Sequence, residues 1–242
     1  ASTLQGSAVD RQAFNDMIVE YTSEVVPNFD LPAEADVAGV YPGTSYRLNA
    51  AGQEIDQLFF KGLIGAFTLD QIVNNYLHPN QLDSGDNIAN NDNDVLDGDS
   101  NYTKMEHKWD EGFGYLYGLE GDNLANAGAS PSGNGSLLMK YFKKVDEEGG
   151  YEPGIGQVVY DAFIMGRTAI VNKDYELRDQ QAAIIKVELS KVIGYYAIHY
   201  MNDYVAKLEA GNVAKAHHSL SEAWGFLLSL SFTNNGNDEP FM

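Results

Sequence analysis

Apolar residues recur at helical spacing along most of the chain and predict an all-helical fold. Such spacing places one side chain of nearly every turn on the same helix face. Strand-like alternation is confined to brief runs near residues 37–47. We expect the helices to pack as a bundle or as a pair of bundles. The pattern predicts helices over residues 10–26, 53–77, 103–119, 136–145, 157–171, 174–208 and 213–231.

Two segments lack this spacing and predict long irregular loops. Residues 27–52 are interrupted by prolines, and residues 80–101 are rich in Asp and Asn. Such polar composition cannot build a core. The acidic run 83–99 looks like a calcium loop, but its turn glycine, Gly98, would place Asn93 and Val95 at the first and third ligand positions. A solvated loop is the better interpretation, and calcium binding by this run stays an open alternative.

One motif occurs twice along the chain. Residues 107–119 and 218–230 align without gaps on the pattern His-x-x-x-Glu, Gly or Ala, aromatic, Gly, aromatic, Leu. Identical polar residues at matched positions indicate an internal duplication. The matched pairs are His107 with His218, Glu111 with Glu222, and Gly114 with Gly225. We therefore predict two pseudo-repeated bundles, an N-terminal one over 1–145 and a C-terminal one over 146–242, forming one compact unit.

The repeated His and Glu are four residues apart, so in a helix they share one face. The opposite side carries large apolar residues, including Trp109 and Trp224, and a helix that is apolar on most sides is buried. A buried carboxylate is costly unless it is paired. Two alternatives remain open. Imidazole and carboxylate are common metal ligands, and the same side chains could instead complete a hydrogen-bond network that stabilises the helix packing.

Further charged residues could belong to the same metal site or hydrogen-bond network. Arg167 lies within an apolar helix and is expected to pair with a buried carboxylate. His199 could add a third ligand, although a core histidine with its hydrogen bonds satisfied is the more ordinary explanation. We expect His78 and His217 to be surface or capping residues. The candidate partners of Arg167 are Asp110, Glu111 and Glu222.

Composition narrows the possible functions. The chain has 15 basic and 35 acidic residues, a net charge of −20, which disfavours binding to nucleic acid or anionic lipid and attracts cations. The absence of cysteine excludes thiolate ligands and a cysteine nucleophile. No run approaches the roughly 20 apolar residues of a transmembrane helix. The first residue is Ala1 rather than Met, which is typical of a trimmed chain or of a processed mature form. The 15 Tyr residues, the many Asn and Gly residues and the acidic bias are common in exported proteins.

Three blocks resemble a bacterial family catalogued as a domain of unknown function, and the resemblance extends over about residues 40–232. That family is similar to the imelysin-like proteins, which are exported, helical and built of two bundles related by duplication. The resemblance implies this fold, export and an association with iron uptake, and some imelysin-like proteins are described as metallopeptidases. Their hallmark is Gly-x-His-x-x-Glu, whereas here three residues separate the His from the Glu. The blocks are residues 105–115, 162–175 and 218–226.

We therefore expect an exported imelysin-like protein that binds a metal ion, iron or another divalent metal, or an iron chelate in iron acquisition. A periplasmic or cell-surface location is expected, with a lipid anchor at a removed N-terminus and an outer-membrane or periplasmic uptake partner. A metal-dependent peptidase and a structural or partner-binding protein are the alternatives, and a non-enzymatic role is favoured. The predicted site lies between the halves and comprises His107, Glu111, His218 and Glu222, supported by Arg167, Asp110, His199, Gly114 and Gly225.

Overall fold

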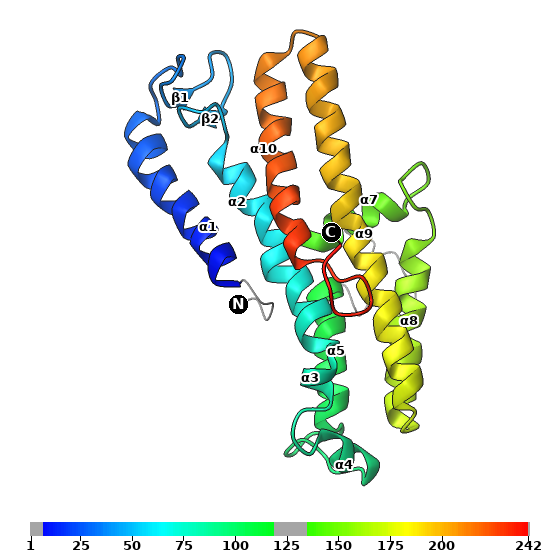
Figure 1. The fold of residues 1–242 in the computed structure, drawn as a ribbon. Coiled ribbons are helices and arrows are strands. Elements are labelled where there is room, and N and C mark those ends of the chain that lie inside the picture. The colour runs from blue at the N-terminus through cyan, green and yellow to red at the C-terminus, as the bar shows by residue number, and fades with distance from the viewer. Residues whose placement is uncertain (1–6, 119–134, 242) are drawn as a thin grey trace. The chain divides into compact units, whose positions relative to one another are not determined.

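The computed structural model describes residues 7–118 and 135–241, and its regular structure is mostly helical (Figure 1). The predicted all-α class is confirmed. Within these residues the only sheet is one pair of two-residue strands. The internal duplication is not confirmed by the structure and stays a prediction.

The described residues divide into two compact units. The α5 unit comprises residues 65–118, 135–192 and 230–241, and the α10 unit comprises residues 7–64 and 193–229. Each unit takes segments from both sides of the boundary predicted at residue 145.

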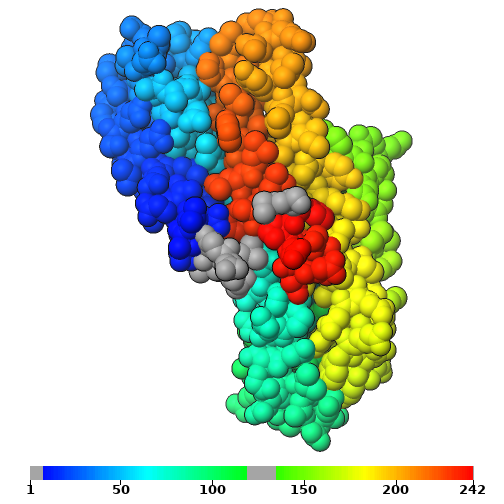
Figure 2. Space-filling model, viewed as in Figure 1, coloured from blue at the N-terminus to red at the C-terminus, as the bar shows by residue number. Residues whose placement is uncertain are grey.

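The α10 unit holds four helical stretches and the irregular segment 27–52. Helix α1 (Ser7–Glu20) continues into a π-helical turn (Tyr21–Val25) and a 3-10 turn (Val26–Asn28). Strand β1 (Gly39–Val40) pairs antiparallel with β2 (Arg47–Leu48). Helix α2 (Ile55–Leu63), the second part of α9 (Tyr175–Glu209) and α10 (Val213–Ser229) complete the unit. Figure 2 shows the surface over residues 27–52 in blue to light blue.

Close helix contact organises this unit. In Figure 1, α10 runs between α2 and the second part of α9. A Cβ on Gly225 would collide with the Lys61 side chain and lie 2.7 Å from the carbonyl oxygen of Leu58, so glycine allows α10 to approach α2. On the other side of α10, the ring of Phe226 lies 5.6 Å from that of Tyr196 on α9.

The α5 unit is built around α5 (Lys104–Tyr117), α8 (Ile155–Val171) and the first part of α9. Trp109 is buried, and its indole N–H donates to the carbonyl of Phe163 at 2.9 Å. A Cβ on Gly166 would collide with the Trp109 ring, so this contact requires glycine. The remaining elements are π-helical segments Ile64–Leu69 and Gln71–Tyr76, α3 (Pro79–Leu82), α4 (Asn87–Asp92), α7 (Leu137–Asp146) and the 3-10 turn Leu230–Phe232.

The segment 80–101, predicted as an irregular loop, contains helical turns. Helix α3 extends to Leu82, and α4 covers Asn87–Asp92. Asn87 and Asn91 are buried, and their side-chain amides donate to the carbonyls of Leu82 (3.0 Å) and Ile170 (2.9 Å). The prediction was wrong here because asparagine side chains, rather than apolar ones, anchor the segment.

The single helix predicted over residues 53–77 is also divided. Helix α2 ends at Leu63, and π-helical hydrogen bonding follows from Ile64. Apolar spacing identifies the buried face but does not distinguish the α-helical from the π-helical backbone hydrogen-bond pattern.

Among residues 7–118 and 135–241, none of the helices combines the length and the hydropathy that a membrane-spanning helix needs.

Candidate functional site

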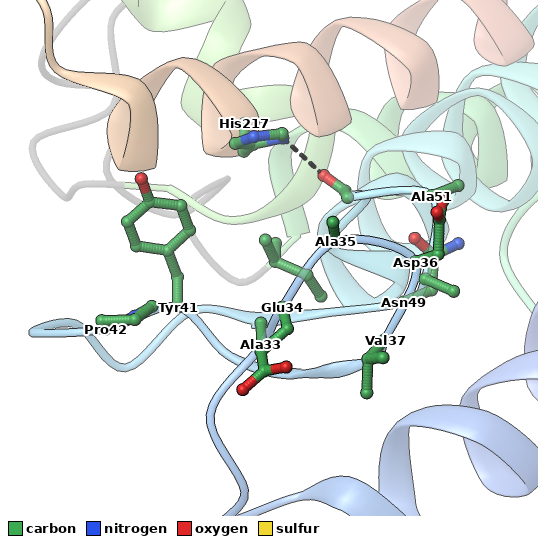
Figure 3. Close-up of a pocket in the computed structure, with 13 residues that line it drawn as sticks. Ala33, Glu34, Ala35, Asp36, Val37, Tyr41, Pro42, Asn49, Ala51 and His217 are labelled. Atoms are coloured by element: carbon green, nitrogen blue, oxygen red, sulfur yellow. Dashed lines mark hydrogen bonds between the residues drawn. The ribbon is translucent and has the colours of Figure 1, made fainter.

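A pocket of about 490 Å³ opens on the α10 unit (Figure 3). One α10 side chain, His217, lines it, and the other lining residues come from segment 27–52. Small ligands are commonly bound in pockets of about 300–1,000 Å³. The lining residues are Ala33, Glu34, Ala35, Asp36, Val37, Tyr41, Pro42, Leu48, Asn49, Ala50, Ala51, Gly52 and His217.

Backbone hydrogen bonds hold the pocket wall. The Ala33 N–H donates to the carbonyl of Val40 at 2.8 Å, and the Val40 N–H donates to that of Leu31 at 2.7 Å. A Cβ on Gly39 would lie 2.8 Å from the Ala33 nitrogen, so the two chain segments approach this closely only at a glycine. The segment predicted as irregular is therefore ordered by main-chain pairing.

His217 has a defined hydrogen-bond role. Its Nδ1 lies 2.8 Å from the carbonyl oxygen of Gly52 (Figure 3). A carbonyl only accepts, so Nδ1 carries the proton, and the neutral imidazole has its lone pair on Nε2. Gly52 has φ +80°, and a Cβ there would lie 2.8 Å from Cε1 of His217, so both backbone and space require glycine. The Tyr41 ring lies 6.0 Å from the imidazole.

A buried ionic network surrounds the next residue, His218. Its Nδ1 lies 2.5 Å from Oε2 of Glu54, and its Nε2 lies 3.5 Å from Oε2 of Glu222. The Lys61 ammonium lies 3.1 Å from the other oxygen of Glu222. The Tyr46 ring stacks on the imidazole at 4.8 Å. The side chains of Glu54 and Glu222 are only 4% and 9% exposed, so their charges are balanced within this network.

These contacts raise the pKa of His218. The hydrogen bond to Glu54 is the largest cause, burial opposes it, and the charge of Glu222 adds to it. Carboxylates near both ring nitrogens favour the imidazolium, which donates to Glu54 and forms an ion pair with Glu222.

Ser221 joins this network to the pocket wall. It accepts a hydrogen bond from the Glu54 N–H at 2.9 Å and donates to the carbonyl of His217 at 2.8 Å. The chain at Gly52 and Glu54 is therefore fastened to α10 at His217 and at Ser221. This arrangement fixes His217 relative to the wall that it faces.

The first copy of the motif has different surroundings. His107 and Glu111 lie in the α5 unit, and their side chains are 39% and 30% exposed, so the prediction that this pair is buried was wrong. His107 contacts Asp97 at 3.0 Å, and Glu111 contacts Lys108 at 2.7 Å. The charges of His107 and Glu111 are paired at the helix surface. The face of α5 that is buried is the one that carries Trp109.

The two matched glycines and the two tryptophans also differ. A Cβ on Gly225 would collide with α2, whereas one on Gly114 would meet nothing within 4 Å. Close approach of a neighbouring helix is therefore found at Gly225 and not at Gly114. Trp109 is 1% exposed, but Trp224, expected on a buried side, is 48% exposed because α10 turns its small residues towards α2.

The other charged residues singled out from the sequence have ion-pair, ring or capping contacts. Arg167 pairs with Asp110 at 3.0 Å, as expected, and also with Glu106 at 2.6 Å. His199 lies between Tyr196 and Tyr200, with ring separations of 5.2 and 5.1 Å. His78 caps α3 by accepting from the Asn80 N–H, as predicted.

The acidic run 83–99 makes ion pairs with basic side chains. Asp83 pairs with the buried Arg178 at 2.6 Å, Asp94 pairs with Lys173 at 2.5 Å, and Asp97 pairs with His107. Over residues 7–118 and 135–241, no group of three or more His, Asp or Glu side chains is arranged to hold a metal ion.

The four predicted ligands fall into two sets. His107 and Glu111 belong to the α5 unit, and His218 and Glu222 belong to the α10 unit. Only His218 and Glu222 contact each other. Their role in binding a metal or ligand stays a prediction.

Sequence reasoning missed Glu54 and the pocket residues. Glu54 precedes α2 without a motif, so only the tertiary structure brings it to His218. His217 was expected to be a surface or capping residue, and the His217–His218 doublet was the one available signal.

One family matches the chain. The family described as a domain of unknown function (DUF4856) matches residues 1–242. No curated protein and no solved structure gives a significant match.

Proposed function

We propose that this chain, which belongs to the family described as a domain of unknown function (DUF4856), is a binding protein. Its pocket on the α10 unit takes a small metal chelate. Iron is the metal that the imelysin-like resemblance favours. The protein then acts as a carrier or receptor rather than as an enzyme.

The observation that carries the proposal is the placement of His217 on the pocket. The carbonyl of Gly52 fixes the proton on Nδ1 at 2.8 Å, so Nε2 offers a lone pair. Histidines that ligate metals commonly donate their other ring nitrogen to a backbone carbonyl in this way. The lone pair can fill a coordination position left open on a chelated metal or accept a hydrogen bond from the chelator.

A chelate fits this site better than a bare ion. In the part of the chain that the structure describes, no set of three His, Asp or Glu side chains gathers as a metal would require. A chelate brings its own donor atoms and needs mainly a cavity with a few polar contacts. The 490 Å³ pocket with Tyr41 and His217 on its lining provides these.

Export and iron acquisition complete the proposal. The imelysin-like resemblance supports both, and the net charge of −20 suits a protein whose ligand is not anionic. Fractionation of cells that express the full gene, grown with and without iron, tests the location. Recovery of the chain only in the cytosol would contradict export.

Calorimetry tests the binding itself. The chain is titrated with ferric complexes of a trihydroxamate, of citrate and of nitrilotriacetate, and with each chelator free of metal. We expect saturable binding of at least one complex, weakened by about tenfold or more in His217→Gln, a loss of about 1.4 kcal/mol of binding free energy. Gln can still donate to the Gly52 carbonyl, so the wall is retained.

The control is His78→Gln, a change at a capping histidine of the α5 unit. It should bind as the wild type does. Absence of binding for every complex, or equal binding by His217→Gln, contradicts the proposal. Loss of binding in Glu222→Gln or Glu111→Gln, with His217→Gln unaffected, would move the site to the repeated motif.

A further inference from the structure

We infer that the chelate bound in this pocket is uncharged or positively charged, and that Glu34 and Asp36 select against anionic chelates. This inference rests on the proposed function and adds the chemical class of the ligand. It concerns side chains that have no part in the repeated motif.

The pocket lining carries acidic but no basic side chains. Glu34 and Asp36 are both exposed, and neither Lys nor Arg lines the pocket. Within the described residues neither carboxylate forms an ion pair. A nearby cation, Arg47, is held elsewhere, because its guanidinium lies 3.6 Å from the centre of the Phe29 ring and donates to the Phe29 carbonyl at 3.1 Å. The two negative charges therefore remain available to a ligand.

The backbone holds these two residues in a tight turn. The Glu34 N–H donates to the carbonyl of Val37 at 3.3 Å, and the Val37 N–H donates back at 3.1 Å. Asp36 has φ +58°, a left-handed conformation that aspartate tolerates better than most residues. The turn thus holds both Glu34 and Asp36 in the lining of the pocket (Figure 3).

Electrostatics decides which ferric chelates such a lining accepts. Three hydroxamate groups balance the charge of the ferric ion, and a pendant ammonium makes the complex cationic. Citrate and catecholate complexes keep a net negative charge. Two carboxylates within several ångströms of the ligand change its affinity by about tenfold between opposite charges in a hydrated pocket. The effect should weaken as salt is added.

The test compares two ferric complexes of similar size by calorimetry on the full chain. One is a trihydroxamate with a pendant ammonium, and the other is a citrate complex. We expect the cationic complex to bind about tenfold or more tightly than the anionic one. The double variant Glu34→Gln/Asp36→Asn should reduce this preference to about threefold or less.

A matched variant separates the local effect from the total charge. Asp99→Asn/Glu148→Gln removes the same charge from exposed positions of the α5 unit and should keep the full preference. Equal or tighter binding of the citrate complex by the wild type, or an unchanged preference in Glu34→Gln/Asp36→Asn, overturns the inference. If the citrate complex binds and His217→Gln abolishes that binding, only the charge selection fails. If neither of these complexes nor the nitrilotriacetate complex binds, the proposed function fails with it.

Discussion

His217 and His218 are neighbours on α10 but meet opposite surroundings. His217 donates to the Gly52 carbonyl and lines a pocket, whereas His218 lies between the carboxylates of Glu54 and Glu222. A backbone carbonyl accepts only from a protonated ring nitrogen, so it fixes the tautomer of His217. Two nearby carboxylates favour the positively charged form of His218. One histidine is therefore suited to contact a ligand, and the other stabilises the wall around it.

The raised pKa of His218 predicts a pH-dependent contribution to stability. Its hydrogen bond to Glu54 favours the charged form, so the stabilisation is fully present below the unfolded pKa of about 6.5 and is lost as pH rises through the folded pKa. The difference in melting temperature between wild type and His218→Gln should be larger at about pH 6 than at about pH 9. Thermal melts at both pH values measure it. A difference that stays constant or grows towards pH 9 would refute the assignment.

The matched glycines predict opposite effects of the same substitution. Gly225→Ala forces a methyl group against Lys61 and the Leu58 carbonyl, and overpacking of this kind costs about 1–3 kcal/mol. Gly114→Ala meets open space and should gain about 0.5–1 kcal/mol from helix propensity. Denaturant unfolding of both variants checks this pair. Destabilisation by Gly114→Ala, or no effect of Gly225→Ala, would show that the helix contacts are wrong.

At the scale of elements, α5 is the helix whose start is best defined by its sequence. Thr103 accepts from the Glu106 N–H at 3.3 Å, and the Glu106 carboxylate accepts from the Thr103 N–H at 2.5 Å, so the two residues form a capping box. The Thr103 hydroxyl also donates to Asn91 at 2.6 Å. The same residue thus ends the acidic segment and begins the helix that carries Trp109.

Thr103→Ala should lower the stability of the α5 unit by about 1–2 kcal/mol. The change removes the side-chain cap of α5 and leaves the buried side-chain oxygen of Asn91 without the hydroxyl that donates to it. The fluorescence of Trp109 in a Trp224→Phe background reports this unit. Ser136→Ala is the matched control, since Ser136 precedes α7 without a side-chain capping bond and should change stability little. Equal effects of the two substitutions would argue against the capping box.

The whole molecule carries a net charge of −20, which disfavours the compact state through self-repulsion. Salt screens exposed charges over a Debye length of about 10 Å at 0.1 M. The melting temperature should therefore rise between about 20 mM and about 500 mM NaCl. A fall over this range would mean that surface ion pairs, such as Lys173 with Asp94, outweigh the repulsion.

The sequence predicted the helices well because apolar periodicity marks the buried faces of α8, α9 and α10. It also predicted that Arg167 pairs with a carboxylate, and Asp110 was one of the three candidates. It did not predict the pocket, because segment 27–52 is held by main-chain hydrogen bonds that leave no periodic signal. The contact of Glu54 with His218 joins residues 164 positions apart and depends on the packing of α2 against α10.

Nitrogen NMR of histidine-labelled protein tests the central claim most directly. We predict that His217 carries its proton on Nδ1 and that its Nε2 resonance shifts when a diamagnetic gallium chelate is added, while the resonances of His107 stay in place. A shift confined to His107, or no shift at His217 under saturating chelate, would contradict the account.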